Sequence, residues 1–173
     1  MRHIRIAVIA GLAMTVASVA QARVPRNCEL VSKLEKRGAS SLGCKMQGDI
    51  CFVRGSEGGL LEEYMKDAEK YKVIVIDGRC VSACVLVADH FRDKVWITAR
   101  ATFYVHQGEE TYDREINGRM YVCFTGKRSS NTFNNVDLQA WITAHGGQPR
   151  NGFLHIHNKE ARKFWRLYDP AKK

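Results

Sequence analysis

The pattern of apolar and polar positions divides the chain after residue 48 into short apolar runs and segments with helical spacing. Residues 72–77 form a nearly continuous apolar run, as expected of a parallel strand covered on both faces. Residues 49–54 are β-branched and aromatic in character and lead into a glycine-rich turn over 55–59. Between these runs, apolar side chains recur at helical spacing over residues 60–71. The pattern therefore predicts a strand, an amphipathic helix and a central strand in succession.

The rest of the chain continues this alternation, which is typical of an α/β domain with crossover connections. A largely apolar helix is predicted to begin at Ser82. Residues 107–126 are charged and polar, and only one short strand is expected there, over 120–124. The remaining predictions are strands over residues 94–98, 101–106 and 153–156, and helices over 134–145 and 159–168.

The first 22 residues have the composition of a secretory signal peptide. A charged start is followed by an apolar run over residues 6–19 and by Ala20-Gln21-Ala22, so we expect cleavage after Ala22. A retained membrane anchor is the alternative, but the apolar run is shorter than the roughly 20 residues that span a bilayer. The expected organisation is a signal peptide over 1–22, a disulfide-tethered segment over 23–48 and one domain over 49–173.

The cysteines point to the same oxidising environment. An even number of cysteines, all beyond the predicted leader, favours disulfides over metal binding, and six cysteines permit 15 pairings. Cys44 and Cys51 flank a glycine-containing turn, while Cys80 and Cys84 bracket a helix start, so each pair is near enough to bridge. A zinc site is the alternative, although no paired C-x-x-C spacing occurs. The six are Cys28, Cys44, Cys51, Cys80, Cys84 and Cys123.

The charge of the chain argues against a nucleic-acid partner. Lys and Arg number 27 against 18 Asp and Glu, which gives a formal net charge of +9. The basic residues are scattered without a dense run, as on a solvated surface rather than in a nucleic-acid groove. We expect no transmembrane segment once the leader is removed, because no later run is long and apolar enough.

Ser82 is the first candidate for chemistry. A nucleophilic serine needs a sharp strand-to-helix turn, a nearby base and backbone N–H groups aimed at the developing oxyanion. Ser82 follows a buried strand and opens an apolar helix, so its hydroxyl and the N–H of Ala83 are expected to face the same side. The alternative is that Ser82 only caps the helix.

Two other sequence features are candidates for the base and the backbone N–H groups that a nucleophilic serine needs. His106 ends the strand predicted over residues 101–106, at the carboxyl edge where ligands gather in open α/β sheets. Gly58 and Gly59 precede a helix, and a glycine pair there lets the backbone approach a substrate and offer N–H groups. The chain thus carries a glycine turn, a serine turn and a strand-end histidine, in that order.

These motifs resemble those of the Clp-type serine peptidases. Ser56-Glu57-Gly58-Gly59 is similar to the Ser-Pro-Gly-Gly turn of that family, with Glu57 in place of proline. Cys80-Val81-Ser82-Ala83-Cys84 resembles its nucleophile turn, and Tyr104-Val105-His106-Gln107 its histidine motif, 24 positions after Ser82. The Cys-x-Ser-Ala-Cys form is similar to that of the secreted branch of the Clp/crotonase superfamily, and the likeness spans about residues 50–168.

The resemblance implies an α/β fold of repeated ββα units with a mainly parallel central sheet. It also implies a periplasmic or secreted serine hydrolase, a peptidase by this likeness, that acts on a peptide or small acyl substrate without a cofactor. Ser82 would attack a carbonyl, with His106 as general base and the N–H groups of Gly59 and Ala83 as oxyanion hole, beside Gly58. Asn151 falls where the family has an aspartate, and an asparagine orients an imidazole without stabilising its charge. Asp113 or Asp137 is the alternative third residue, and their predicted positions favour neither.

Several alternatives remain open. A catalytically weak or inactive family member would bind a peptide or an envelope partner in the same cleft. A crotonase-like acyl-CoA enzyme is a third hypothesis, although coenzyme A is not expected in the periplasm. His155 and His157 form an H-x-H pair near His145 but lack a carboxylate or cysteine at ligand spacing, so no metal site is assigned. Assembly into a homo-oligomer is left open.

Overall fold

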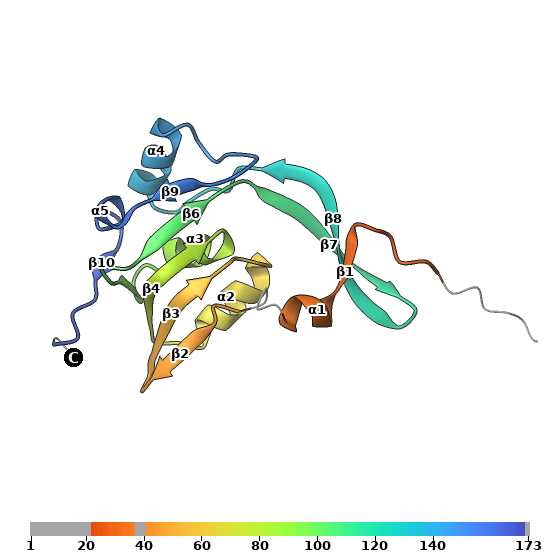
Figure 1. The fold of residues 1–173 in the computed structure, drawn as a ribbon, viewed down its shortest axis with the longest axis horizontal. Helices are drawn as coiled ribbons and strands as arrows, with labels where there is room; N and C mark the ends of the chain where they lie inside the picture. The colour runs from red at the N-terminus through yellow and green to blue at the C-terminus, as the bar shows by residue number, and fades with distance from the viewer. Residues whose placement is uncertain (1–21, 37–40, 172–173) are drawn as a thin grey trace, which may run out of the picture.

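Two β-sheets and a layer of helices build the protein. The structure is a computed structural model that describes residues 22–36 and 41–171, so the predicted leader over 1–22 lies almost wholly outside the described residues. Figure 1 shows an α/β body from which a long hairpin projects, with the first strand and helix lying against that hairpin. The helices are α1 (Val31–Lys36), α2 (Leu61–Glu69), α3 (Ala83–His90), α4 (Val136–Ala144) and α5 (Asn158–Ala161).

The larger sheet has seven strands and is centred on β4 (Val73–Val81). The first half of β4 pairs in parallel with β5 and its second half with β6, while β3 runs parallel along its other edge. Strand β9 then extends the sheet beyond β6. The other strands of this sheet are β2 (Cys44–Gln47), β3 (Ile50–Ser56), β5 (Val95–Ile97), β6 (Thr102–Val105), β9 (Leu154–Ile156) and β10 (Arg166–Leu167).

The predicted fold of repeated ββα units with a mainly parallel central sheet is wrong. The large sheet is mixed, since β2 pairs with β3 and β6 with β9 in antiparallel fashion. The second sheet, of β1 (Cys28–Leu30), β7 (Gly108–Ile116) and β8 (Arg119–Ser129), is wholly antiparallel. A turn of two residues joins β2 to β3, and another joins β7 to β8. Strands joined in this way run antiparallel, because a parallel pair needs a longer crossover connection. The sequence patterns showed strands and helices but not these pairings.

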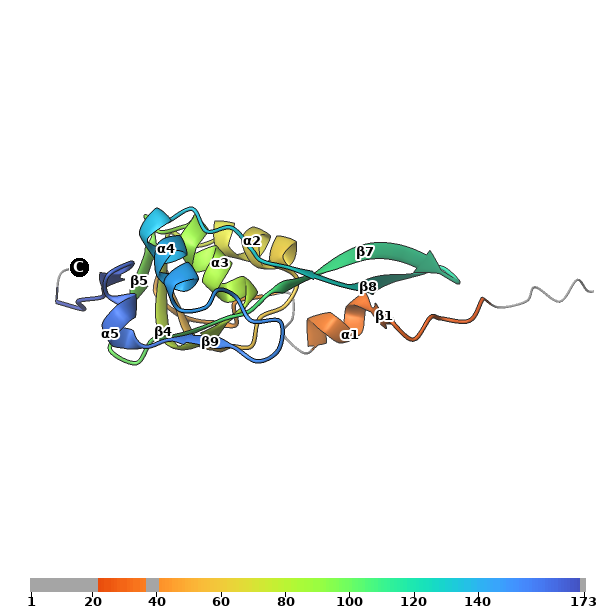
Figure 2. The ribbon, with the colours of Figure 1, turned by 90° about the horizontal axis from the view of Figure 1, so that it is seen from above.

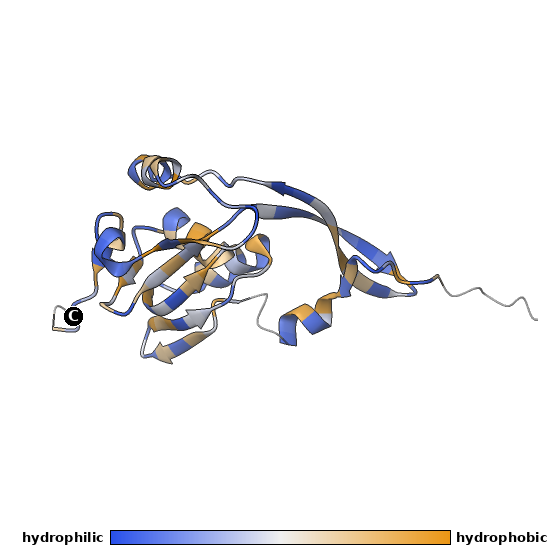
Figure 3. Ribbon diagram, turned by 45° about the horizontal axis from the view of Figure 1, so that its top comes forward, coloured by the Kyte–Doolittle hydropathy of each residue, from blue (hydrophilic) through white to orange (hydrophobic). Residues whose placement is uncertain are grey.

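The hairpin of β7 and β8 is the largest element that sequence reasoning missed. Charged and polar residues occupy both of its faces because it projects from the body, as Figure 3 shows by its mostly hydrophilic colouring. The alternation that normally reveals a half-buried strand is therefore absent. The turn signal was present: Asn117 and Gly118 have φ of 52° and 71°, as in the two-residue turns that close hairpins.

The helix predicted over residues 159–168 is also wrong. Helix α5 ends at Ala161, and the chain then enters the short strand β10. Phe164 and Trp165 are buried, and the Trp165 indole donates to the carbonyl of Ala88 at 2.9 Å. Their burial is set by contacts with α3 and the sheet rather than by helical spacing. The helices predicted over 60–71 and 134–145 are confirmed by α2 and α4.

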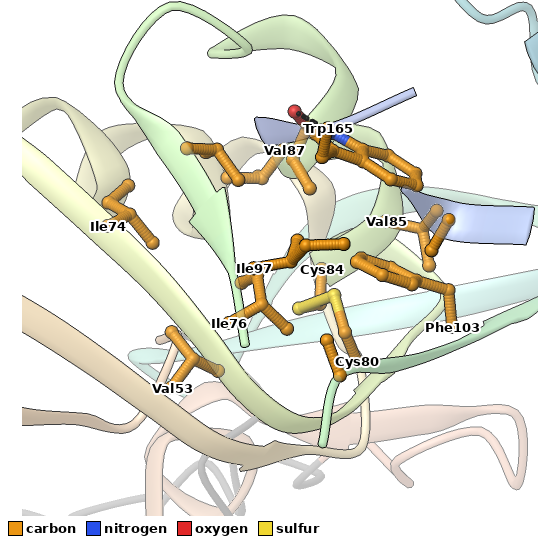
Figure 4. Packing of buried hydrophobic residues seen from close by; sticks show 14 of the residues in the cluster. Val53, Ile74, Ile76, Cys80, Cys84, Val85, Val87, Ile97, Phe103 and Trp165 are labelled. Atoms are coloured by element: carbon orange, nitrogen blue, oxygen red, sulfur yellow. Dashed lines mark hydrogen bonds between the residues drawn. A yellow bond between two sulfur atoms is a disulfide. The ribbon is translucent and has the colours of Figure 1, made fainter. Parts of the chain in front are cut away.

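The core lies between the large sheet and its helices. Figure 2 shows α2 and α3 on one side of the sheet, and Figure 4 shows β-branched side chains of β3, β4 and β5 packed beneath α3. Phe103 stacks on Trp165 with ring centroids 4.3 Å apart. This packing anchors both ends of β4, the strand that leads into Ser82.

Three disulfides join the cysteines, so the prediction of disulfides is confirmed. The bridges are Cys28–Cys123, Cys44–Cys51 and Cys80–Cys84. The first ties β1 to β8 across 95 positions of the chain. Such bridges are typical of extracellular or otherwise oxidising environments. In the described part of the chain, no helix has the length and apolarity to cross a membrane.

Gly78 is the position where the large sheet tolerates no side chain. A Cβ at Gly78 would lie 2.0 Å from the carbonyl oxygen of Arg54, whereas a Cβ at Gly55 meets nothing within 4 Å. We expect Gly78→Ala to lower the free energy of unfolding by about 2–3 kcal/mol, because β3 and β4 must move apart. Urea denaturation followed by circular dichroism measures this.

Gly55→Ala is the matched control and should change the free energy of unfolding by less than about 0.5 kcal/mol. Equal stability of the Gly78→Ala and Gly55→Ala variants would contradict the close approach of the two strands.

Candidate functional site

Ser82 has an unusual backbone conformation between β4 and α3. Its φ is 54° and its ψ is −114°. In the described chain, Ser82 and Asn117 are the non-glycine residues with a positive φ. Such conformations cost of order 1–3 kcal/mol and persist only where surrounding contacts enforce them. The Ser82 side chain makes no capping hydrogen bond, although the residue occupies the N-cap position. The ordinary capping role weighed from the sequence is therefore not observed.

Several contacts enforce this turn. The Cys80–Cys84 disulfide spans it, and both cysteines are fully buried (Figure 4). The N–H of Ser82 donates to the carbonyl of Tyr104 at 2.9 Å, and the N–H of Val85 donates to the carbonyl of Ser82 at 2.9 Å. The chain is thus fixed on both sides of Ser82, while its hydroxyl makes no capping hydrogen bond within the described residues.

The glycine turn after β3 lies directly against Ser82. Gly58 has φ of +81°, and a Cβ there would lie 2.8 Å from both the Ser82 Cβ and the Val81 carbonyl oxygen. The start of this turn is held by Ser56, whose hydroxyl shares a buried hydrogen bond of 2.9 Å with Tyr64. Burial raises the pKa of that phenol, which keeps it neutral. Glycine is therefore required at position 58 for both conformation and space.

Ala83 is the first residue of α3, so its backbone N–H lies at the N-terminus of that helix. The first N–H groups of a helix are free of intrahelical bonds and carry the positive end of its dipole. Gly59 precedes the N-cap residue Leu60 and lies outside α2, so this argument applies to Ala83 alone. The family resemblance implies that both amides form an oxyanion hole.

His106 leaves the sheet at the same edge as Ser82. Strands β4 and β6 are parallel, with Val81 opposite Tyr104, so the residues that follow them emerge side by side. The His106 ring is half-buried and meets the edge of Phe153, with centroids 5.1 Å apart. The structure thus brings together the serine, histidine and glycine elements that lie far apart along the chain.

The pKa of His106 is lowered, first by burial and second by the positive charge of Arg128, while a backbone hydrogen bond at Gln107 acts in the opposite direction. Arg128 itself pairs with Glu109 at 3.6 Å. A depressed pKa keeps the imidazole neutral near pH 7, and only the neutral ring can accept a proton. His106 is therefore in the protonation state that a general base requires.

A pair of side-chain amides positions the backbone at His106, and sequence reasoning missed both. The Asn131 amide donates to the carbonyl of His106 at 3.3 Å and to the Gln148 carbonyl at 3.1 Å. Gln148 is buried and returns a hydrogen bond to the Asn131 carbonyl. Next to it, the N–H of Gln107 donates to the carbonyl of Pro149 at 3.1 Å. No local pattern in the sequence connects amides 17 positions apart.

Asn151 is not brought to the imidazole. It is exposed in the loop between α4 and β9, and within the described residues it makes no hydrogen bond to His106. Asp113 in β7 and Asp137 in α4 are likewise exposed, and neither contacts the ring through a hydrogen bond in that part of the chain. The imidazole is held by packing and by the backbone rather than by a carboxylate.

The histidines of the H-x-H pair interact with one another instead. The rings of His155 and His157 have centroids 3.7 Å apart, and His145 stacks on Trp141 at 3.8 Å. Over residues 22–36 and 41–171, no group of three or more His, Cys, Asp or Glu side chains could hold a metal ion.

The structure is that of a disulfide-bonded, mixed α/β protein in which Ser82 and His106 follow two neighbouring parallel strands. Among the described residues, no hydrogen bond joins the Ser82 hydroxyl to the His106 ring. No family model, curated protein or solved structure matches this chain.

Arg128 offers a direct test of what sets the pKa of His106. We expect Arg128→Gln to raise the His106 pKa, because a positive charge that disfavours the imidazolium is removed. Proton NMR of the ring resonances as a function of pH measures the change. Lys127→Gln removes an equal charge one residue away, where the side chain is exposed, and should change the pKa less. Equal shifts in both variants would mean that Arg128 acts only through net charge.

Proposed function

We propose that this protein is a serine hydrolase that acts on a peptide or a small acyl substrate. The observation that carries the proposal is the conformation of Ser82: a strained, non-capping serine at a strand-to-helix turn, next to the strand β6 that His106 directly follows. Such strain is found at functional sites because neighbouring contacts must maintain it. The likeness of its motifs to Clp-type serine peptidases favours peptide bonds among acyl substrates.

The proposed reaction uses Ser82 as nucleophile and His106 as general base. As the Ser82 oxygen attacks the carbonyl, its proton passes to the neutral imidazole, and the N–H groups of Ala83 and Gly59 stabilise the oxyanion. Collapse of this intermediate breaks the bond to the leaving group, which takes the proton from the imidazolium. Water, activated by His106, then hydrolyses the acyl-serine and restores the free hydroxyl.

Among the described residues no carboxylate forms a hydrogen bond with the His106 ring, so the proposed hydrolase is a slow one. A carboxylate orients the imidazole and stabilises its charged form, and replacing it by asparagine in serine proteases lowers kcat by about 10⁴. Here burial and Arg128 both oppose the imidazolium. Slow deacylation would allow the acyl-enzyme to accumulate.

A binding module that uses the same surface is the second candidate. It is favoured by the lack of a hydrogen bond between the Ser82 hydroxyl and the His106 ring among the described residues, because a serine without a bonded base is a weak nucleophile. For either function, the signal-like first 22 residues and the disulfides favour a periplasmic or secreted protein.

A fluorophosphonate probe distinguishes the two candidates. We expect the purified protein to be labelled at Ser82, and both Ser82→Ala and His106→Ala to reduce labelling at least a hundredfold, since the probe reacts only with an activated serine. Intact-mass spectrometry measures the labelled fraction. Ser130→Ala, which removes an exposed serine, should be labelled like the unchanged protein. A folded protein that stays unlabelled would favour the binding module.

Gly58→Ala tests the contact between the glycine turn and Ser82. The added methyl group would clash with the Ser82 Cβ and the Val81 oxygen, so we expect labelling to become at least tenfold slower. Gly118→Ala is the control, because Gly118 has a similar φ of +71° but open space around it. Both variants carry the same backbone strain. Equal labelling rates in the two would show that the turn does not shape the site.

A further inference from the structure

Four side chains from β4, β6 and the β9 segment contact one another in a row. Tyr104 of β6 lies opposite His155 of β9, and their rings stack with centroids 4.4 Å apart and planes 9° from parallel. From β4, on the other side of β6, the Arg79 guanidinium carbon lies 4.9 Å from the Tyr104 ring centroid. His157 continues the row, 3.7 Å from His155. We call Arg79, Tyr104, His155 and His157 the cationic row.

The cationic row presents hydrogen-bond donors. Because neighbours cover the ring faces, the polar edges of the phenol and imidazoles are what remains for a ligand, together with the guanidinium of Arg79. Arg79 and His157 are exposed, and Tyr104 and His155 are half-buried. The ion-pair partner of Arg79 is Glu57, at 3.5 Å on a side chain that is 73% exposed. A solvated pair of this kind is weak and readily exchanged for another anion.

One polar atom of the row lacks a partner. His155 Nε2 is buried and makes no hydrogen bond within the described chain. Buried polar atoms are nearly always paired, so an unpaired one calls for an explanation such as a ligand or water. Burial, followed by the influence of His157, lowers the pKa of His155, so at neutral pH this imidazole acts as a neutral group and Arg79 supplies the charge.

The cationic row is continuous with the proposed catalytic residues. Arg79 lies in β4, three positions before Ser82, which directly follows the strand; this is a span of about 10 Å at strand spacing. Tyr104 precedes His106 by two positions, and the Phe153 ring meets both, with centroids 6.1 and 5.1 Å away. A substrate group bound at the row would therefore be separated by only a few bonds from a substrate carbonyl placed at Ser82.

We propose that the cationic row is a subsite for a carboxylate of the substrate that Ser82 attacks. This inference rests on the proposed hydrolase function and narrows its substrate class to peptides or acyl groups with a carboxylate several bonds from the scissile carbonyl. Arg79 pairs with the carboxylate in place of Glu57. Guanidinium and carboxylate form strong, directional pairs, so Arg79 is the residue on which selectivity depends.

A pair of chromogenic esters tests this assignment. The p-nitrophenyl monoester of glutaric acid and p-nitrophenyl valerate have acyl chains of the same length, ending in a carboxylate and a methyl group. We expect the unchanged protein to prefer the glutarate ester, and Arg79→Ala to lower kcat/KM for that ester about tenfold while changing the valerate value less than twofold. Arg114→Ala, which removes an exposed arginine on the hairpin, should leave both values unchanged.

Equal losses on both esters in Arg79→Ala would overturn the subsite, because they would indicate a structural role only. If the protein hydrolyses neither ester and is not labelled by the fluorophosphonate, the hydrolase proposal fails. The subsite is then decided by fluorescence anisotropy with fluorescein-labelled tetraglutamate and tetraglutamine in the Ser82→Ala background. Tighter binding of tetraglutamate that is lost in Arg79→Ala supports the row, and equal binding of both peptides overturns it.

Discussion

The backbone conformation of Ser82 is the constraint on which the site depends. A positive φ at a residue with a Cβ costs of order 1–3 kcal/mol, and surrounding contacts must offset that cost. The Cys80–Cys84 disulfide fixes the two ends of the turn, the Tyr104 carbonyl binds the Ser82 N–H, and Gly58 leaves space beside its Cβ. Each contact comes from a different element, so the turn exists only in the folded chain.

The change of partner along β4 explains why these elements meet. Ile74 to Ile76 pair with β5, whereas Arg79 to Val81 pair with β6, which runs on towards His106. Gly78 lies at the junction, where a Cβ would clash with the Arg54 carbonyl of β3. One strand thereby supplies both the buried core and the edge that carries Ser82. The cationic row runs over the same strands, from β4 through β6 to the β9 segment.

The surroundings of His106 determine what chemistry is available. Burial and Arg128 keep its imidazole neutral, which favours accepting a proton from Ser82 but opposes holding it. The Asn131 and Gln148 amides fix the backbone, so the ring is oriented without a carboxylate. In the proposed reaction, these surroundings favour acylation of Ser82 over rapid turnover. Arg128 and Arg79 each have an acidic partner, Glu109 and Glu57.

The sequence by itself determined the local elements and the candidate residues, because apolar spacing and glycine positions act over short distances. It predicted α2, α4 and the strand leading to Ser82, and it selected Ser82, His106 and Gly58. Tertiary structure alone decided the antiparallel pairings, the projecting hairpin, the exposed position of Asn151 and the row through Tyr104. Strand pairing and side-chain stacking join residues distant in the chain, and no local periodicity records which strands become neighbours.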